Sequence, residues 1–188
     1  MKSLWVSILL LALAGCRSTQ AELEWLASQT SIDPVFRERE KRHAGSDALL
    51  RTWGELEFPD GLVLKQGEER VWHKDGTLAA IRHFDHGEQV GEWHRFWPDG
   101  SPRSFANLDE ESLTTMRFWH ETGVLAAEGP ARGGVREGAW RHDWPSGLSR
   151  ARGEYLEGRK HGPWEYFDES GRLSERCEYR AGKRLPGR

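Results

Sequence analysis

Five glycines recur at an almost constant spacing and constrain the fold more than any other feature of the chain. They are Gly76, Gly100, Gly123, Gly147 and Gly171, and the gaps between them are 24, 23, 24 and 24 residues. A second mark stands nine residues before each of them, a glycine in four copies and Thr114 in the third copy. A fixed period in this range predicts a repeat architecture, in which each copy packs on its neighbours.

Each of these turn glycines follows a segment rich in aromatic residues and precedes an alternating run, which is the pattern of a β-hairpin. Pro98 and Pro145 stand two residues before Gly100 and Gly147. Proline cannot donate a ladder hydrogen bond, but it suits the first central position of a type I turn that ends in a left-handed glycine. We therefore expect three-residue loops, in which the residue four before the glycine pairs with the residue two after it.

This register predicts two faces of different character. One face is expected to be mostly apolar, because residues such as Trp72 and Leu78 pair across it. The other face is expected to hold a row of tryptophans, with arginines opposite two of them as cation–π partners. Two interpretations of this row stay open, namely packing between the copies or a platform for a ligand. The candidate binding face consists of Trp93, Trp140, Trp164, Arg152 and Arg176.

The first fifteen residues have the pattern of an export signal, because Lys2 precedes an apolar run and small residues before Cys16. The apolar run is shorter than the roughly 20 residues that a stable transmembrane helix needs. Leu13-Ala14-Gly15-Cys16 resembles the lipobox of bacterial lipoproteins. That resemblance implies cleavage before Cys16 and its lipidation, and two or more acyl chains suffice for stable anchoring. The alternative is an ordinary secretory signal with a chance cysteine.

The residue after the lipobox adds an expectation about location. Arg17 follows Cys16, and a residue other than aspartate at this place is similar to lipoproteins sorted to an outer membrane. We therefore expect a lipid-anchored protein of the bacterial cell envelope, facing the periplasm from the outer membrane if the organism has one.

The segment between the signal and the repeats lacks the glycine rhythm. Short helices are expected near 21–27 and from Pro34 to about Arg42, the latter with Asp33 as its N-cap. A turn signal at Gly61 predicts a capping hairpin, which repeat arrays need at their ends. The predicted domains are a signal peptide (1–15), a lipidated tether with short helices (16–52), a capping hairpin (53–66) and a repeat domain (67–188).

The third copy departs most from the pattern. It has Thr114 and Met116 where the other copies have glycine and mostly tryptophan, and Asp109-Glu110-Glu111 fills the place where its neighbours turn at a glycine. A bulged or looser connection is expected at about residues 107–116.

The fifth copy resembles the bacterial variant of the MORN repeat. Gly162-Pro163-Trp164-Glu165-Tyr166-Phe167 is followed by Gly171, Leu173, Tyr179 and Gly182 in the order of that motif. The resemblance implies an all-β repeat fold, a single-layer antiparallel meander of about five to six β-hairpins preceded by a short helical or flexible tether. It also implies a scaffold or binding surface, and some bacterial proteins with such repeats are similar to antitoxin components of toxin systems.

Composition and missing motifs narrow the function. With 30% charged residues and a mean hydropathy of −0.75, a thin sheet suits the chain better than a thick core. No Gly-rich phosphate loop, nucleophile elbow or HExxH motif occurs, so we expect no enzyme, no cofactor and no metal. From residue 53 onward 20 basic and 24 acidic residues give a net charge of −4, which argues against nucleic acid binding.

These observations favour a lipid-anchored, non-catalytic scaffold. We expect its partners to be an unidentified envelope protein and, through Cys16, the membrane. The alternatives are an antitoxin or immunity protein that neutralises a toxin, and a protein that binds cell-wall glycans through the tryptophan row.

Overall fold

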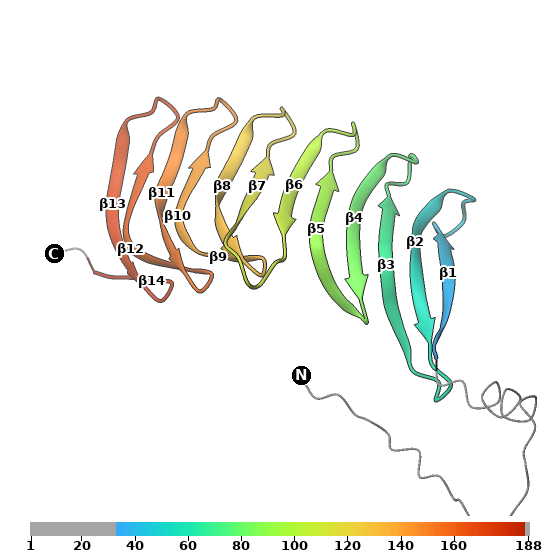
Figure 1. The fold of residues 1–188 in the computed structure, drawn as a ribbon. Coiled ribbons are helices and arrows are strands. Elements are labelled where there is room, and N and C mark those ends of the chain that lie inside the picture. Colours follow the sequence, from blue (N-terminus) through green and yellow to red (C-terminus); the bar gives the residue numbers. More distant parts are fainter. Residues whose placement is uncertain (1–32, 187–188) are drawn as a thin grey trace, which may run out of the picture. The chain divides into compact units, whose positions relative to one another are not determined.

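The regular elements of residues 33–186, which the computed structural model describes, are all β-strands (Figure 1). They form one antiparallel sheet in which neighbours in sequence lie side by side, except that β10 pairs with β8 and the short β9 also pairs with β8. The strands are β1 (Val35–Arg42), β2 (Leu49–Glu57), β3 (Val63–Trp72), β4 (Leu78–Asp85), β5 (Glu88–Phe96), β6 (Pro102–Asn107), β7 (Thr114–Trp119), β8 (Leu125–Arg132), β9 (Val135–Arg136), β10 (Gly138–Asp143), β11 (Ser149–Leu156), β12 (Arg159–Phe167), β13 (Leu173–Arg180) and β14 (Lys183–Arg184).

The sheet is a single layer of successive hairpins, and no helix covers either face among the described residues. Figure 1 shows the strands of the repeats bowed in the same sense, with the turns of the five copies aligned along one end of the strands. The predicted fold class, an all-β meander of MORN-like hairpins, is confirmed.

The three-residue loops are confirmed by their hydrogen bonds. In the second copy Gly100 N donates to Trp97 O at 2.9 Å, which places Pro98 and Asp99 at the central positions of the turn. The five turn glycines all have φ between 81° and 89°, in the left-handed region. The prolines therefore predicted the turn type correctly.

A β-bulge next to each turn was not predicted, and it moves the tryptophan row to the other face. Trp72 pairs with Leu78 as expected, but the next pair is Val71 with Ala80, and the same register shift occurs in all five copies. The extra residue reverses the alternation beyond the bulge. The predicted pairs of Trp140 with Arg152 and of Trp164 with Arg176 are therefore wrong.

Because of the bulge, the tryptophans lie opposite small residues. Trp140 lies opposite Gly153 and Trp164 lies opposite Cys177. We call the side of the sheet with the tryptophans and the small residues Ala80, Ala127 and Ala151 the aromatic face. The opposite side, which includes Arg152 and Arg176, is the polar face.

The helix predicted from Pro34 to Arg42 is wrong, because β1 occupies this segment. The mixed charges that suited a solvated helix instead form ladders with β2, where Arg37 pairs with Glu57 and Arg39 with Glu55 at 2.5 and 2.9 Å. The sheet thus begins at Val35, earlier than the predicted start at residue 53. The predicted helix near 21–27, the signal peptide and Cys16 lie outside the described residues.

The capping hairpin also differs in position from the repeats. Gly61 N donates to Phe58 O at 2.9 Å, so the turn has the chemistry of the later copies. However, the β2–β3 turn lies at the opposite end of the strands from the turns of the five copies (Figure 1). The predicted irregularity of the third copy is confirmed, because residues 108–113 between β6 and β7 are not part of a strand.

A ladder of side-chain hydrogen bonds links the turns of successive copies. The side chain three residues before a turn glycine bonds a backbone carbonyl of the following copy. That carbonyl belongs to the residue four before the following turn glycine. In the first copy, His73 Nε2 lies 3.2 Å from Phe96 O. His120 Nε2 bonds Asp143 O at 3.0 Å, and Trp144 Nε1 donates to Phe167 O at 3.2 Å. Trp97 is the exception, because its Nε1 is buried without a partner. Histidines in the turns thus have a structural role.

Candidate functional site

The tryptophans of the aromatic face are packed between the copies. The ring of Trp164 lies on Gly153, and the ring of Trp140 lies on Gly129 of the strand before it. Their side chains leave 1% and 2% of the residue surface exposed. Their Nε1 atoms donate to Glu154 O at 3.1 Å and to Pro130 O at 2.8 Å. These two residues therefore form the core of the sheet and present neither ring face nor N–H group to a flat ligand platform.

Trp93 is arranged differently because Arg82 stands where the third and fourth copies have Gly129 and Gly153. Arg82 donates to the buried carboxylate of Glu69 at 3.2 Å, so its side chain takes part in a charge network. Trp93 is half-buried, and its Nε1 is buried without a partner. The Arg95 guanidinium lies 4.5 Å from the centre of the Trp93 ring. The first two copies thus replace part of the tryptophan stacking with charged side chains.

Basic residues stand above the aromatic rings at one recurring position, eleven residues before the turn glycine. Arg136 lies 4.6 Å from the ring centre of Trp140 and donates to the Tyr155 hydroxyl at 3.0 Å. In the next copy the ammonium of Lys160 lies 4.3 Å from the Trp164 ring and donates to the Tyr166 hydroxyl at 2.8 Å. Cation–π contacts of this kind stabilise a cation that has no carboxylate partner.

The two cations and both tyrosines line a groove on the aromatic face, with a volume of about 620 Å³, which runs over the last two copies. Trp144 and Arg150 come from the turn region of the fourth copy, with the guanidinium 5.5 Å from the indole ring. None of the lining residues is acidic. They are Arg136, His142, Trp144, Arg150, Ala151, Tyr155, Lys160, Trp164, Tyr166, Phe167 and Ser174.

The pKa of His142 reflects the electrostatic environment of this groove. Burial, together with the positive charges of Arg136, Arg150 and Lys160, lowers the pKa of the His142 imidazole to about 4. The ring is therefore neutral near pH 7, and three cations lie close enough to act on it. Burial also raises the pKa of the Tyr166 hydroxyl, which therefore stays protonated at neutral pH. The groove combines neutral aromatic walls with three positive charges.

Three arginines of the polar face bind carboxylates, unlike those of the groove. Arg152 and Arg176 both bind the Glu165 carboxylate, at 2.6 and 2.9 Å, and lower its pKa chiefly through the Arg152 hydrogen bond. Arg117 pairs with Glu128 at 2.8 Å in the same way. By contrast, Arg136, Arg150 and Lys160 make no ion pair with any carboxylate in the described part of the chain. The groove therefore concentrates three unpaired positive charges on the aromatic face.

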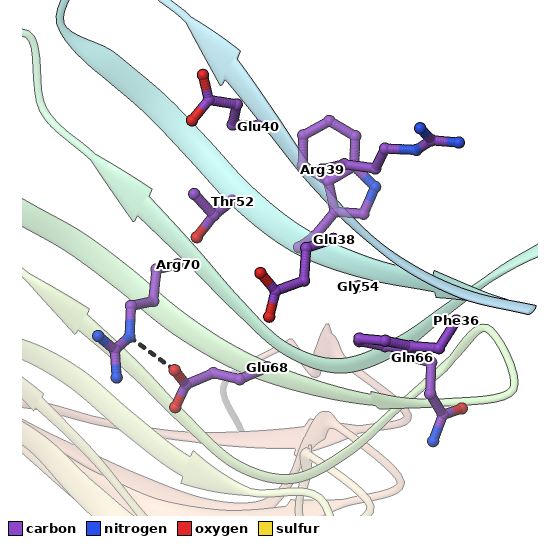
Figure 2. Close-up of a pocket in the computed structure, with 10 residues that line it drawn as sticks. Phe36, Glu38, Arg39, Glu40, Thr52, Gly54, Gln66, Glu68 and Arg70 are labelled. Atoms are coloured by element: carbon purple, nitrogen blue, oxygen red, sulfur yellow. Dashed lines mark ion pairs between the residues drawn. The ribbon is translucent and has the colours of Figure 1, made fainter.

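A second hollow, of about 560 Å³, lies over β1, β2 and β3 (Figure 2). Figure 2 shows Glu38, Glu68 and Arg70 around it, and Arg70 binds Glu68 at 2.6 Å. The ring of Phe36 fills the space beside Gly54. Because its charges of both signs are largely paired within the protein, this hollow has less to offer a ligand than the groove.

Residues 160–181 match the MORN repeat variant in a comparison with known protein families. This segment is a MORN repeat. It extends from eleven residues before Gly171 to ten residues after it, and the glycine spacing places equivalent windows at 65–86, 89–110, 112–133 and 136–157. A comparison with curated proteins found no match. The matched repeat contains Lys160, Trp164 and Tyr166 of the groove, so the groove is built from the repeat motif itself.

The structure separates the predicted candidate binding face. Trp140 and Trp164 are buried on the aromatic face, Trp93 lies further along it, and Arg152 and Arg176 are on the polar face. Sequence reasoning missed the groove cations, although the recurrence of Lys65, Arg136 and Lys160 eleven residues before a turn glycine was a usable signal.

Two further tests concern metals and membranes. Within residues 33–186 no cluster of three or more His, Cys, Asp or Glu side chains could hold a metal ion. The same part of the chain contains no helix long and apolar enough to cross a bilayer.

Proposed function

We propose that this chain is a lipid-anchored, non-catalytic scaffold of the bacterial cell envelope that binds another protein in the groove on its aromatic face. The observation that supports it most is a groove of about 620 Å³ with three cations and aromatic walls, on a sheet face that no other element covers in the described residues. An open concave site with a few polar groups is the usual form of a binding site.

The groove is a better candidate than the free edge of the sheet at β1. Strand addition needs an accessible and flat edge. The β1 sequence Val35–Arg42 has charged residues at six consecutive positions, from Arg37 to Arg42, and charged edges discourage pairing with another chain. At the other end, Leu185 N donates to Glu178 O at 2.8 Å, so the C-terminal segment occupies part of that edge.

Affinity capture with paired variants tests the proposal. The full-length tagged chain, solubilised in detergent, is compared with Ser174→Trp, which fills the groove, and with Arg172→Trp on the adjacent exposed turn. We expect a protein that is enriched by the wild type and by Arg172→Trp but lost with Ser174→Trp. Equal enrichment by all three, or no reproducible enrichment, would contradict binding in the groove.

Anchoring rests on the lipobox resemblance and has its own test. Cys16→Ala should move the protein from the membrane fraction to a soluble or unprocessed pool and abolish labelling by a radioactive fatty acid. Cys177→Ala is the matched control and should change neither result. An unchanged membrane fraction for Cys16→Ala would refute the lipid anchor, and the proposal for the groove would not be affected.

A further inference from the structure

The groove contains three positive charges that the protein does not neutralise. Arg136 and Lys160 each contact aromatic rings and one tyrosine hydroxyl, and Arg150 is exposed with only the Trp144 ring beside it. The polar face shows that this sheet can pair its arginines, since Arg152 and Arg176 share Glu165. The unpaired charges of the groove therefore mark a complementary anion on the partner.

We propose that the groove binds an extended acidic peptide segment of the partner protein, whose carboxylates contact Arg150 and Arg136. This inference rests on the proposed function and specifies the chemistry of its partner. Arg150 and Lys160 come from the adjacent strands β11 and β12, and Arg136 comes from β9. The Arg150 side chain is open to solvent, so a carboxylate can approach it without displacing any residue of the core.

The dimensions of the groove fit such a segment. Apart from Arg136 on β9, its lining residues extend from β10 to β13, and three strand spacings of roughly 4.8 Å give about 14 Å across the ladder. An extended chain advances by roughly 3.3 Å per residue, so about four residues cover this distance. Side chains alternate along such a segment, and those of every second residue face the groove. A segment with carboxylates at alternate positions would therefore direct about two of them towards the cations.

A peptide is favoured over a membrane surface because the charge lies in a recess. Arg136, Arg150 and Lys160 line a hollow of about 620 Å³ together with the buried Trp164 and the half-buried His142, so they do not stand on a flat plane. Juxtamembrane cations act on lipid headgroups when they stand on an accessible surface. On the polar face, by contrast, Glu128 binds Arg117, and Glu165 binds Arg152 and Arg176.

Fluorescence anisotropy with a labelled Glu-Gly octapeptide of four repeats tests this inference on the full-length chain in detergent. The peptide with glutamine in place of glutamate should bind at least about tenfold more weakly, because its carboxylates are gone. Arg150→Glu should weaken binding of the acidic peptide by about tenfold, and Arg150→Gln by less. The control Arg172→Glu, with the same charge change outside the groove, should change it by less than about twofold.

Three results would overturn the inference. These are equal binding of the glutamate and glutamine peptides, equal losses for Arg150→Glu and Arg172→Glu, and displacement of the peptide by phosphatidylglycerol micelles at lower concentration than by unlabelled peptide, which would assign the groove to a lipid. If the Ser174→Trp variant still loses its captured protein while the acidic peptide fails to bind, the proposed function stands and only the acidic nature of the partner is wrong.

Discussion

The ring of Trp164 lies so close to Gly153 that a Cβ atom built on this glycine would be 2.4 Å from Trp164 Cδ2. Trp140 and Gly129 repeat this contact one copy earlier, at 2.5 Å. The backbone of Gly153 is outside the left-handed region, so the glycine is required by the neighbouring ring and not by its own φ angle. Where the tryptophan is absent, the glycine is absent too. In the third copy Met116 replaces the tryptophan, and Ala106 replaces the glycine beside it.

Gly153→Ala should destabilise the sheet by about 1–3 kcal/mol, because the added methyl group forces the Trp164 ring out of place. Urea unfolding measures the loss. The double variant Gly153→Ala, Trp164→Met copies the Ala106–Met116 pair, so its loss should be smaller than the sum of the two single losses. Additive losses would show that the two positions do not interact.

The turn ladder offers a matched pair of tryptophans. Trp144 donates to Phe167 O, whereas the equivalent Trp97 has no acceptor, and each precedes a proline and lies under an arginine. Trp144→Phe should therefore cost about 1 kcal/mol more in unfolding free energy than Trp97→Phe, since only the former removes a hydrogen bond. Equal losses in urea unfolding would argue against the ladder.

His142 should make stability depend on pH in the acidic range. Its folded-state pKa of about 4 is below the unfolded value near 6.5, so the unfolded chain binds the proton first as the pH falls. Stability is therefore fully present above about pH 6.5 and falls towards pH 4, by on the order of 2–3 kcal/mol for this group.

The measurement is urea unfolding at pH 7.5 and pH 4.5 for the wild type and for His142→Gln. The variant should lose part of the difference between the two pH values, because glutamine does not titrate. His161→Gln, which does not line the groove, should retain the wild-type difference. A His142→Gln variant with the full wild-type pH dependence would contradict the assignment.

The sequence predicted the features that depend on local interactions, but not those that depend on contacts between strands. Local chemistry settled the turns, and Pro98 with Gly100 was enough to establish a three-residue loop. The bulge beside each turn involves two strands and leaves no residue-type signature at Ala79, so the face of the tryptophans could not be read from alternation. The β1 segment was misassigned because Arg37 and Arg39 form ion pairs with glutamates of β2. Such contacts between strands cannot be read from the local sequence that suggested a helix.

The groove was hidden for the same reason. Its members Arg136, Arg150 and Lys160 are separated along the chain, and only the corrected register brings them to one face. Arg152, two residues from Arg150, looked like the better candidate when paired with Trp140 in the uncorrected register.

Photo-crosslinking on β13 tests the central claim, that the partner protein binds the aromatic face, most directly. Ser174 lines the groove and Glu178 is exposed further along the same strand, outside the groove lining. Benzoylphenylalanine is introduced at either position in the full-length chain, and the cells are irradiated. We expect a discrete adduct with another protein from position 174 and none from position 178. Adducts from position 178 alone would contradict binding in the groove.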